Sequence, residues 1–335
     1  MRLLLVAPLL SGAGRVPDVF ETLGPLLARG GHEVTMTSTR TGSVPRALDQ
    51  ALTTRRRRKD TDVVVVHLYS GRAFLTEDVV SRLAGGARLV GVLAGGGLPA
   101  FGARRPRWVS RVLDRFDALV APSPYLARWA ASCTTTPVTV IPNPLDLAPY
   151  PFRNRAPARP RLLWLRAYHE IYAPEDAVHV VARLVAAHPD VLLTMVGDDK
   201  GRRTEVVRLV ADLGLEANVS VGGFAGPERK QALFEDNDLF LNTSRVDNRP
   251  VSVVEAAACG LVVVSTDAGG VADLVEDGRS ALLASPGDPA AMAEAVGRVL
   301  ADPALARLLS AGGRAVAEQG TPERVLAAWE GLLGR

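Results

Sequence analysis

The chain has 335 residues, more than one ordinary hydrophobic core requires, so two domains are expected. Hydrophobic residues make up 47% of it and charged residues 22%, a balance typical of globular proteins. The net charge of +3 is modest and aromatic residues make up only 5%, which argues against a nucleic-acid partner.

The ends and the cysteines give further limits. The apolar run of residues 1–10 ends without a convincing cleavage region, so we interpret it as a buried first strand rather than a secretion signal. No segment reaches the roughly 18 apolar residues that a membrane span needs. Cys133 and Cys259 form neither a disulfide framework nor a metal-binding spacing, which favours a reducing, cytoplasmic location.

Short β-branched runs alternate with helix-length amphipathic segments over residues 1–150. Val63–Val66 is apolar on both faces, and only a sheet covered by helices on both sides tolerates such a strand. We therefore predict an α/β domain with a doubly wound parallel sheet, which is Rossmann-like, over residues 1–150. Its predicted strands are Leu3–Ala7, Glu33–Thr37, Asp62–His67, Arg88–Leu93, Ala118–Ala121 and Val138–Ile141.

The alternation stops at a proline-rich stretch. Four prolines fall within residues 149–160, and proline both fixes φ and removes a backbone donor. We predict that residues 151–160 are an interdomain linker.

The same alternation restarts and predicts a second Rossmann-like domain over residues 161–320. Its strands are predicted at Leu162–Leu165, Val191–Val196, Val219–Val221, Leu239–Leu241 and Val262–Ser265, and its helices near Pro174–Ala187, Thr204–Leu213, Pro227–Glu235 and Pro250–Cys259. The tail from Pro289 onward is predicted to be helical, with residues 321–335 returning to the first domain. Two such sheets in tandem are expected to face a cleft, with ligands at the carboxyl ends of the strands.

The strongest local signal is the stretch Asp247–Glu255. It follows a predicted strand and leads into a predicted helix whose first turn contains Pro250, a favourable position for proline. The N–H groups of Val251 and Ser252 would then point out of the helix start, where a phosphate binds well. An ordinary capped helix with two surface acids is the alternative from the residues alone.

This stretch resembles the E-x7-E motif of the family 4 retaining glycosyltransferases, also called group 1, which have the GT-B fold. Asp247 stands at the first acidic position and Glu255 at the second. Further segments resemble the family in the same order along most of the chain: residues 30–34, 141–146, 195–198, 241–244, 255–266, 269–271 and 274–278.

The resemblance implies roles for particular residues. The second acid, Glu255, would bind the donor ribose, and the backbone before it would bind the diphosphate and the sugar. Arg166 follows the first strand of the second domain, where the family has a diphosphate-binding arginine. We expect donor contacts from Gly12, Gly14, Arg15, Arg166, Gly197, Lys200, Asn248, Arg249, Val251, Ser252 and Glu255, and catalytic roles for Asp247, His67 and Arg166.

The chain departs from the family pattern in its phosphate-binding residues. The family usually has Lys-Gly shortly after the arginine, whereas this chain has Tyr172-Ala173-Pro174. Lys200 is the nearest substitute in kind, or an exposed loop lysine. In the first glycine-rich loop Gly14 is followed by Arg15, which obstructs close backbone approach unless its side chain turns toward the phosphate.

The most serious departure is Ala94. It stands where the family commonly has a histidine near the reacting sugar. His67, at the end of the third predicted strand, is the candidate to replace that histidine, although a structural role for a lone histidine is the alternative.

Three charged features have ordinary explanations. Asp236-Asn237-Asp238 matches the D-x-D text of metal-dependent glycosyltransferases, but its place between a helix and a strand predicts a turn, so we assign no metal. The run Arg55–Lys59 is interpreted as a solvated loop. Four arginines near helical spacing favour a solvated helix face over a membrane-surface contact: Arg104, Arg107, Arg111 and Arg115.

The leading hypothesis is a metal-independent retaining glycosyltransferase that moves a sugar from a nucleoside diphosphate sugar to an unidentified acceptor, with no further cofactor. The alternative, motivated by Ala94 and the missing Lys-Gly, is a catalytically impaired relative that binds sugar nucleotide as a partner subunit. A dinucleotide oxidoreductase is disfavoured because no predicted strand leads into G-x-G-x-x-G. Base, sugar, acceptor and oligomeric state are not encoded in any motif of the sequence.

Overall fold

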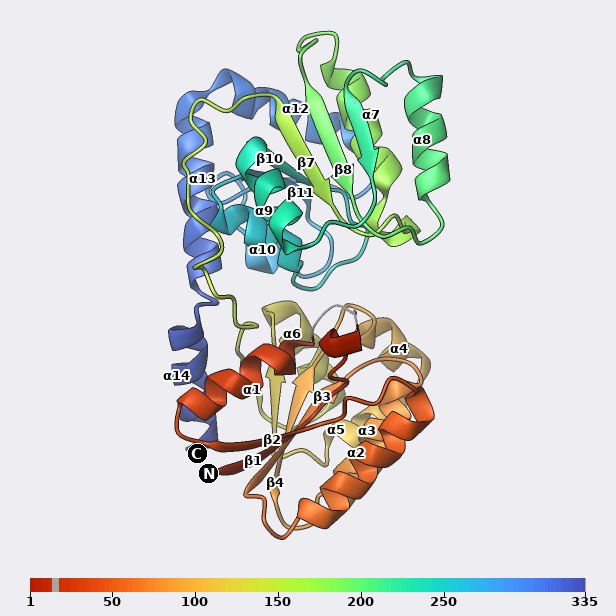
Figure 1. Ribbon diagram of the computed structural model, residues 1–335, viewed down its shortest axis with the longest axis vertical. Coiled ribbons are helices and arrows are strands. Elements are labelled where there is room, and N and C mark those ends of the chain that lie inside the picture. The colour runs from red at the N-terminus through yellow and green to blue at the C-terminus, as the bar shows by residue number, and fades with distance from the viewer. Residues whose placement is uncertain (14–17, 335) are drawn as a thin grey trace. The chain divides into compact units, whose positions relative to one another are not determined.

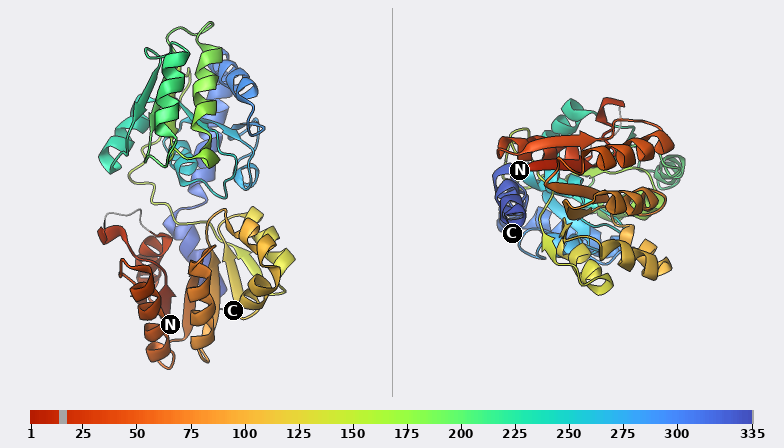
Figure 2. Two further views of the ribbon diagram at one scale, coloured as in Figure 1. Left: turned by 90° about the vertical axis from the view of Figure 1, so that its right-hand side faces the viewer. Right: turned by 90° about the horizontal axis from the view of Figure 1, so that it is seen from below.

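The computed structural model describes residues 1–13 and 18–334, and the chain divides into two compact units (Figures 1 and 2). Unit 1 comprises Met1–Leu145 together with Gly320–Arg335, and unit 2 comprises Asp146–Gln319. In the described part of the chain, no helix combines the length and the apolarity needed to cross a membrane.

The sheet of unit 1 has six parallel strands among the described residues, in the order β2-β1-β3-β4-β5-β6. The strands are β1 (Arg2–Val6), β2 (Glu33–Thr37), β3 (Val63–Leu68), β4 (Arg88–Leu93), β5 (Ala118–Ala121) and β6 (Val138–Val140). The connecting segments are η1 (Ser11–Ala13), α1 (Val19–Arg29), α2 (Ser43–Arg57), α3 (Ala73–Leu83), α4 (Leu98–Arg104), α5 (Pro106–Leu113), α6 (Pro124–Cys133) and, from the end of the chain, α14 (Pro322–Leu333).

Alternate residues of β1, β3, β4 and β5 enter two separate cores. Leu3 and Leu5 of β1 pack on the face covered by α1 and α14, where Trp329 is buried. Leu4 and Val6 pack on the opposite face with residues of α3, α5 and α6. Because both faces of β1 and β3 are covered, their apolar residues have no solvent-facing side, as predicted for a doubly wound sheet.

Unit 2 repeats this architecture with strand order β12-β11-β10-β7-β8-β9 among its described residues. Its strands are β7 (Arg161–Leu165), β8 (Leu192–Val196), β9 (Val219–Gly222), β10 (Leu239–Asn242), β11 (Val262–Thr266) and β12 (Leu282–Ala284). Its helical segments are η2 (Glu170–Tyr172), α7 (Pro174–Leu184), α8 (Arg203–Asp212), α9 (Pro227–Asp236), α10 (Val251–Ala258), α11 (Val271–Leu274), α12 (Pro289–Ala301) and α13 (Pro303–Glu318).

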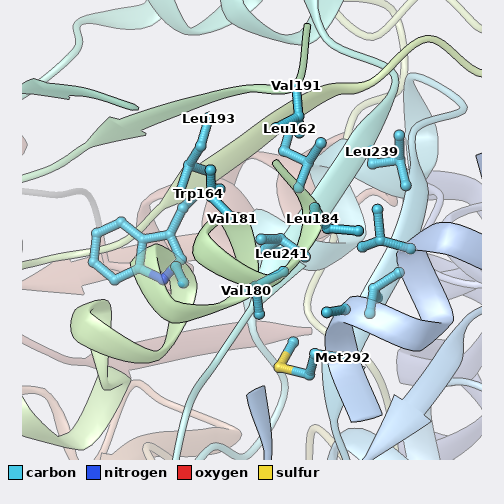
Figure 3. Packing of buried hydrophobic residues seen from close by; sticks show 14 of the residues in the cluster. Leu162, Trp164, Val180, Val181, Leu184, Val191, Leu193, Leu239, Leu241 and Met292 are labelled. Carbon is cyan, nitrogen blue, oxygen red and sulfur yellow. The ribbon is translucent and has the colours of Figure 1, made fainter. Parts of the chain in front are cut away.

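The core of unit 2 lies between β7, β8 and β10 and the helices α7 and α12 (Figure 3). Trp164 of β7 is fully buried there, and its indole Nε1 donates to Thr243 Oγ1 at 3.0 Å. The predicted α/β fold class is therefore confirmed in both units. The short strand β12 was not predicted.

The proline-rich stretch that we predicted as a linker, residues 151–160, lies inside unit 2 rather than between the units. Arg155 is 2% exposed, and its Nη2 donates to the carbonyl oxygens of Phe234 at 2.9 Å and Cys259 at 3.2 Å. Gly260 has φ +84°, and a Cβ there would overlap the carbonyl oxygen of Arg153. Proline content predicted the lack of regular structure correctly, but it carries no information about packing.

Asp238 holds this stretch in place. Its side chain is 2% exposed and forms ion pairs with Arg155 at 3.2 Å, Arg153 at 2.9 Å and Arg159 at 2.8 Å. Its D-x-D partner Asp236 is exposed at the end of α9. The carboxylate of Asp238 is thus committed to three guanidinium groups.

We predict that Asp238→Ala lowers the free energy of unfolding by about 3–5 kcal/mol, because it leaves the buried guanidinium of Arg155 without its counter-charge. Asp236→Ala is the matched control, and we expect it to change stability by no more than about 0.5 kcal/mol, as an exposed substitution does. Denaturant unfolding of both variants measures this difference. Equal losses in the two variants would contradict the role of Asp238.

Candidate functional site

Polar side chains of unit 2 gather after the carboxyl ends of β7 and β10. Arg166 follows β7 and forms an ion pair with Asp247, and both side chains are 13% exposed. Ser244, two residues after β10, lies between them: its Oγ is 3.4 Å from Arg166 Nη2 and 3.3 Å from Asp247 Oδ2. The two predicted catalytic residues of unit 2 are therefore in direct contact.

The guanidinium of Arg166 has a second neighbour. It lies over the ring of Tyr172, with 4.4 Å from Cζ to the ring centroid, a cation–π distance. Burial lowers the pKa of Arg166, and Tyr172 opposes that shift. The resemblance leads one to expect a lysine at the position of Tyr172. In this chain an aromatic ring therefore contacts Arg166 where a second cation would otherwise stand.

Gly197, after β8, has a steric reason to be glycine. A Cβ at this position would overlap the carbonyl oxygen of Arg166, whose own N–H donates to Val196 at 3.1 Å. The glycine therefore lets the ends of β7 and β8 approach closely. Lys200, further along the same loop, has an exposed side chain.

The first turn of α10 combines three features that favour an anion. Pro250 is the N-cap of α10 rather than its first helical residue, with φ −66° and ψ 113°, so the helix begins one residue later than predicted. Its first N–H groups have no partner within the helix and lie at the positive end of the helix dipole. The hydroxyl of Ser252, on the same turn, is buried and has no hydrogen-bond partner among the described residues.

Arg249, immediately before the N-cap, is a half-buried cation that forms no ion pair with a described residue. Burial alone lowers the pKa of its guanidinium to about 10. Asn248 beside it is 7% exposed, and its N–H donates to Asp247 Oδ1 at 2.9 Å. Within residues 249–252 the chain thus combines a guanidinium without a described acidic partner, a helix N-terminus and an unsatisfied hydroxyl, a combination suited to an anion.

Glu255, one turn further along α10, is buried and anchored through one of its two oxygens. Its Oε1 accepts from Tyr150 Oη and from Lys230 Nζ of α9, each at 2.6 Å. Burial and the charge of Glu255 raise the pKa of Tyr150. No described residue donates to Oε2, which leaves that oxygen available to a hydroxyl group of a ligand.

Neither partner of Glu255, Tyr150 or Lys230, was predicted from the sequence. Lys230 lies on an amphipathic helix with other charged residues, and Tyr150 lies in the proline-rich stretch, so neither had a distinguishing pattern. Their contacts arise from tertiary packing alone.

In unit 1, His67 lies near the end of β3 within a network of oriented groups. It is 7% exposed, and its ring stacks on Phe20 of α1 with 4.7 Å between centroids. Its Nδ1 is 3.1 Å from the carboxylate of Asp18, to which Tyr69 also donates its hydroxyl. Burial raises the pKa of Asp18, but hydrogen bonds from His67 and Tyr69 outweigh it and hold that pKa below its ordinary value.

The other positions of unit 1 that were predicted to contact the donor or sugar have few side-chain contacts or lie outside the described residues. Gly12 lies in η1, and a Cβ there would meet no atom within 4 Å. Gly14 and Arg15 lie outside the described residues. Ala94 is 8% exposed, and its N–H donates to the carbonyl of Leu68 at 2.8 Å, which extends the pairing of β3 and β4.

The predicted basic stripe is divided between two helices. Arg104 ends α4, whereas Arg107 and Arg111 are on α5. Arg115, beyond α5, pairs with Asp78 of α3, so its charge is neutralised inside unit 1. The run Arg55–Lys59 is exposed at the end of α2 and just beyond it, where cations complement the helix dipole.

The sequence of the chain is similar to that of known proteins. Residues 155–316 match the family described as glycosyl transferases group 1. D-inositol 3-phosphate glycosyltransferase of Acidothermus cellulolyticus is 30% identical over 214 residues, 59% of this chain and 47% of that protein. Glycogen synthase of Mycobacterium tuberculosis is 29% identical over 180 residues, 51% and 41% of the respective chains. The chain thus spans about half the length of these curated relatives.

Solved structures resemble the whole chain. Sucrose-phosphate synthase from Thermosynechococcus elongatus has a TM-score of 0.80 at 18% identity, covering 99% of this chain and 98% of that one. HepE from Anabaena, in complex with UDP-glucose, has a TM-score of 0.78 at 19% identity and covers 100% of both chains. At these identities the likeness establishes the fold.

We predict that Arg249→Met leaves the free energy of unfolding unchanged or raises it, because the arginine keeps its charge half-buried without an acidic partner. The same variant should bind pyrophosphate at least about tenfold more weakly, since a charge-assisted hydrogen bond contributes about 1.5–3 kcal/mol. Unfolding and calorimetric titration give the two quantities. The control Arg279→Met, at an exposed arginine, should change neither. A large loss of stability in Arg249→Met alone would instead indicate a structural arginine.

Proposed function

We propose that this chain, which belongs to the group 1 glycosyl transferases and has the GT-B fold, is a retaining glycosyltransferase. It would move a sugar from a nucleoside diphosphate sugar to an acceptor. The observation that carries the proposal is the start of α10, where the unpaired Arg249 and the unsatisfied Ser252 hydroxyl precede the buried acid Glu255.

The proposed donor pose follows from these groups. The diphosphate would bind at the N-terminus of α10 and be neutralised by Arg249 and Arg166. The free Oε2 of Glu255 would accept from a ribose hydroxyl, while Lys230 and Tyr150 hold Oε1 and so fix the orientation of the carboxylate. A charge-assisted bond to an oriented carboxylate is stronger than one between neutral groups.

The chemical step would depend on the same cations. Negative charge develops on the leaving diphosphate as the glycosidic bond breaks, and preorganised guanidinium and helix N–H groups stabilise it. Asp247 would contact the donor sugar, since a carboxylate has about four acceptor positions and its bonds to Arg166, Ser244 and Asn248 do not fill them all. In the family resemblance the departing phosphate guides the nucleophile on the same face, which retains the anomeric configuration.

The proposal includes no divalent metal. The acidic pair that resembles a D-x-D motif is divided: Asp238 is buried under three arginines and Asp236 stands alone at the surface. Diphosphate charge would be met by guanidinium groups and helix N–H groups instead. We also propose a cytoplasmic location, because both cysteines are free thiols.

We predict that Glu255→Gln weakens binding of the preferred nucleoside diphosphate by about ten- to a hundredfold, which corresponds to about 1.5–3 kcal/mol for a charge-assisted hydrogen bond. Calorimetric titration should begin with UDP, then GDP, with NAD as the negative comparison. Glu228→Gln, at an exposed acid of α9, is the matched control and should bind normally. Unchanged affinity in Glu255→Gln would remove Glu255 from the donor site.

His67 remains our candidate for the group that acts on the sugar, and its hydrogen bond to Asp18 supports that role because an oriented imidazole presents a defined Nε2. We predict that His67→Ala lowers turnover per folded molecule more than tenfold while nucleotide affinity stays nearly constant, a split that places the lost interaction on the reacting sugar. Thermal unfolding of the same sample reports the folded fraction. A normal rate per folded molecule would mean that His67 only packs against Phe20.

The same measurements separate the alternative function. A protein that binds nucleoside diphosphate but transfers sugar to no acceptor, and does not hydrolyse the donor, would be a binding partner subunit. Ala94 is the observation that favours this alternative, since its small buried side chain offers no group to a sugar.

A further inference from the structure

Unit 1 contains a cavity of about 290 Å³ that is lined by His67 but by none of the residues proposed above to bind the donor diphosphate or ribose. It lies beside the carboxyl ends of β1 and β3, where residues such as Ala7, Pro8 and Tyr69 line it, and it is enclosed by the first turns of α2 and α3. In open α/β sheets, ligands bind at this end of the strands. The cavity is just below the usual volume of small-molecule sites.

The charges that line the cavity are mainly positive. Arg46 of α2 and Arg72, just before α3, both line it, and neither forms an ion pair with a described residue. Among the described residues, the guanidinium of Arg46 donates to the carbonyl oxygens of Arg40 and Thr41, at 3.0 and 3.2 Å. The acid in the wall is Glu77, whose carboxylate accepts from the N–H of Tyr69 and whose pKa is raised well above its ordinary value by burial.

Two helix N-termini add to this positive potential. The first turns of α2 and α3 border the cavity through residues such as Ser43 and Ala73, and neither first turn contains an acid. The dipole of each helix therefore has no side-chain anion at its positive end. The nearby carboxylate of Asp18 is turned to His67, Tyr69 and the N–H of Phe20.

Gln50 adds an uncharged polar group to the wall of the cavity. It lies on α2, lines the cavity and is only 7% exposed, yet its side-chain amide makes no hydrogen bond with a described residue. Its amide donor and acceptor are therefore available for hydrogen bonds to a ligand in the cavity.

We propose that this cavity binds a phosphate monoester carried by a small acceptor, a substrate class that rests on the function proposed above. Two guanidinium groups match the charge of about −1.5 to −2 that a phosphate monoester has near neutral pH, whereas a carboxylate would leave one arginine unneutralised. The amide of Gln50 donates to the phosphate or to an adjacent hydroxyl. The remaining volume accommodates a short polyol or a single sugar ring.

The test uses two probes that differ only in the phosphate, glycerol 3-phosphate and glycerol. Calorimetric titrations are run on the full chain with the donor site saturated by UDP, so that the cavity of unit 1 is the site observed. We expect saturable binding of glycerol 3-phosphate and at least tenfold weaker binding of glycerol. No binding of glycerol 3-phosphate, or equal binding of the two probes, would overturn the proposal.

Substitutions locate the binding. Arg72→Ala removes an exposed side chain that makes no capping bond, so the variant should fold normally, and Gln50→Glu places a negative charge in the wall. Each should weaken glycerol 3-phosphate at least tenfold. Arg56→Ala, at an exposed arginine on the far end of α2, is the matched control and should bind normally. Unchanged binding in both Arg72→Ala and Gln50→Glu would place the anion elsewhere.

Arg249→Ala in unit 2 separates this inference from the proposed function. It should weaken UDP and leave glycerol 3-phosphate binding as it was. If instead Arg249→Ala alone abolished glycerol 3-phosphate binding, the phosphate would occupy the donor site and the cavity proposal would be wrong. If UDP failed to bind the unmutated chain, the proposed function would fail, and titration without UDP would still decide whether the cavity takes the phosphate.

Discussion

The burial of both faces of each parallel sheet is the constraint on which the rest of this structure depends. Strand residues such as Val64, Val65, Val263 and Val264 are inaccessible to solvent on either face, so the central strands are mostly apolar. The buried polar residues that they contain, such as His67 of β3 and Asn242 of β10, lie near the carboxyl ends of the strands. Polar side chains are therefore concentrated at the carboxyl ends of the strands and in the turns that follow them. In unit 2 the turns after the strands hold Ser244 and the Arg166–Asp247 pair, and in unit 1 His67 near the end of β3 meets the carboxylate of Asp18.

The place of each buried arginine in the fold determines which groups compensate its charge. Arg155 is buried and lies in the packed stretch before β7, so it needs Asp238 and several carbonyl oxygens to remain there. Arg166, at a strand end, has one carboxylate and one aromatic ring. Arg249, at the start of a helix, has no described acidic partner and a pKa lowered to about 10 by burial. Along this series the compensation of the arginine charge decreases, and this is why we propose that Arg249, which has the least, is available to an anionic ligand.

Much of the fold was predictable from the sequence because it follows from local patterns. β-Branched runs predicted most of the strands within one or two residues, and the Asp247–Glu255 spacing located the start of α10 within one residue. Partners far apart in the sequence were not predictable. Lys230 and Tyr150 meet on Glu255, and Asp18 meets His67, only because packing brings their elements together. The proline-rich stretch misled for a related reason: proline content describes backbone freedom, whereas the place of residues 151–160 is determined by the buried charge of Arg155.

The departures from the family pattern become consistent when they are considered together. Ala173 has φ +43°, a left-handed conformation that costs a residue with a Cβ and that glycine adopts freely, so this chain keeps a backbone suited to glycine without the glycine. The preceding Tyr172 binds the guanidinium of Arg166 through its ring, where a lysine would have repelled it. Arg166 is thus held by a neutral ring and by the carboxylate of Asp247, which leaves less uncompensated positive charge near the end of β7. The positive charge available to an anion in unit 2 is shifted toward Arg249 and the start of α10, and a diphosphate bound by this chain would depend on that helix more than on the strand end.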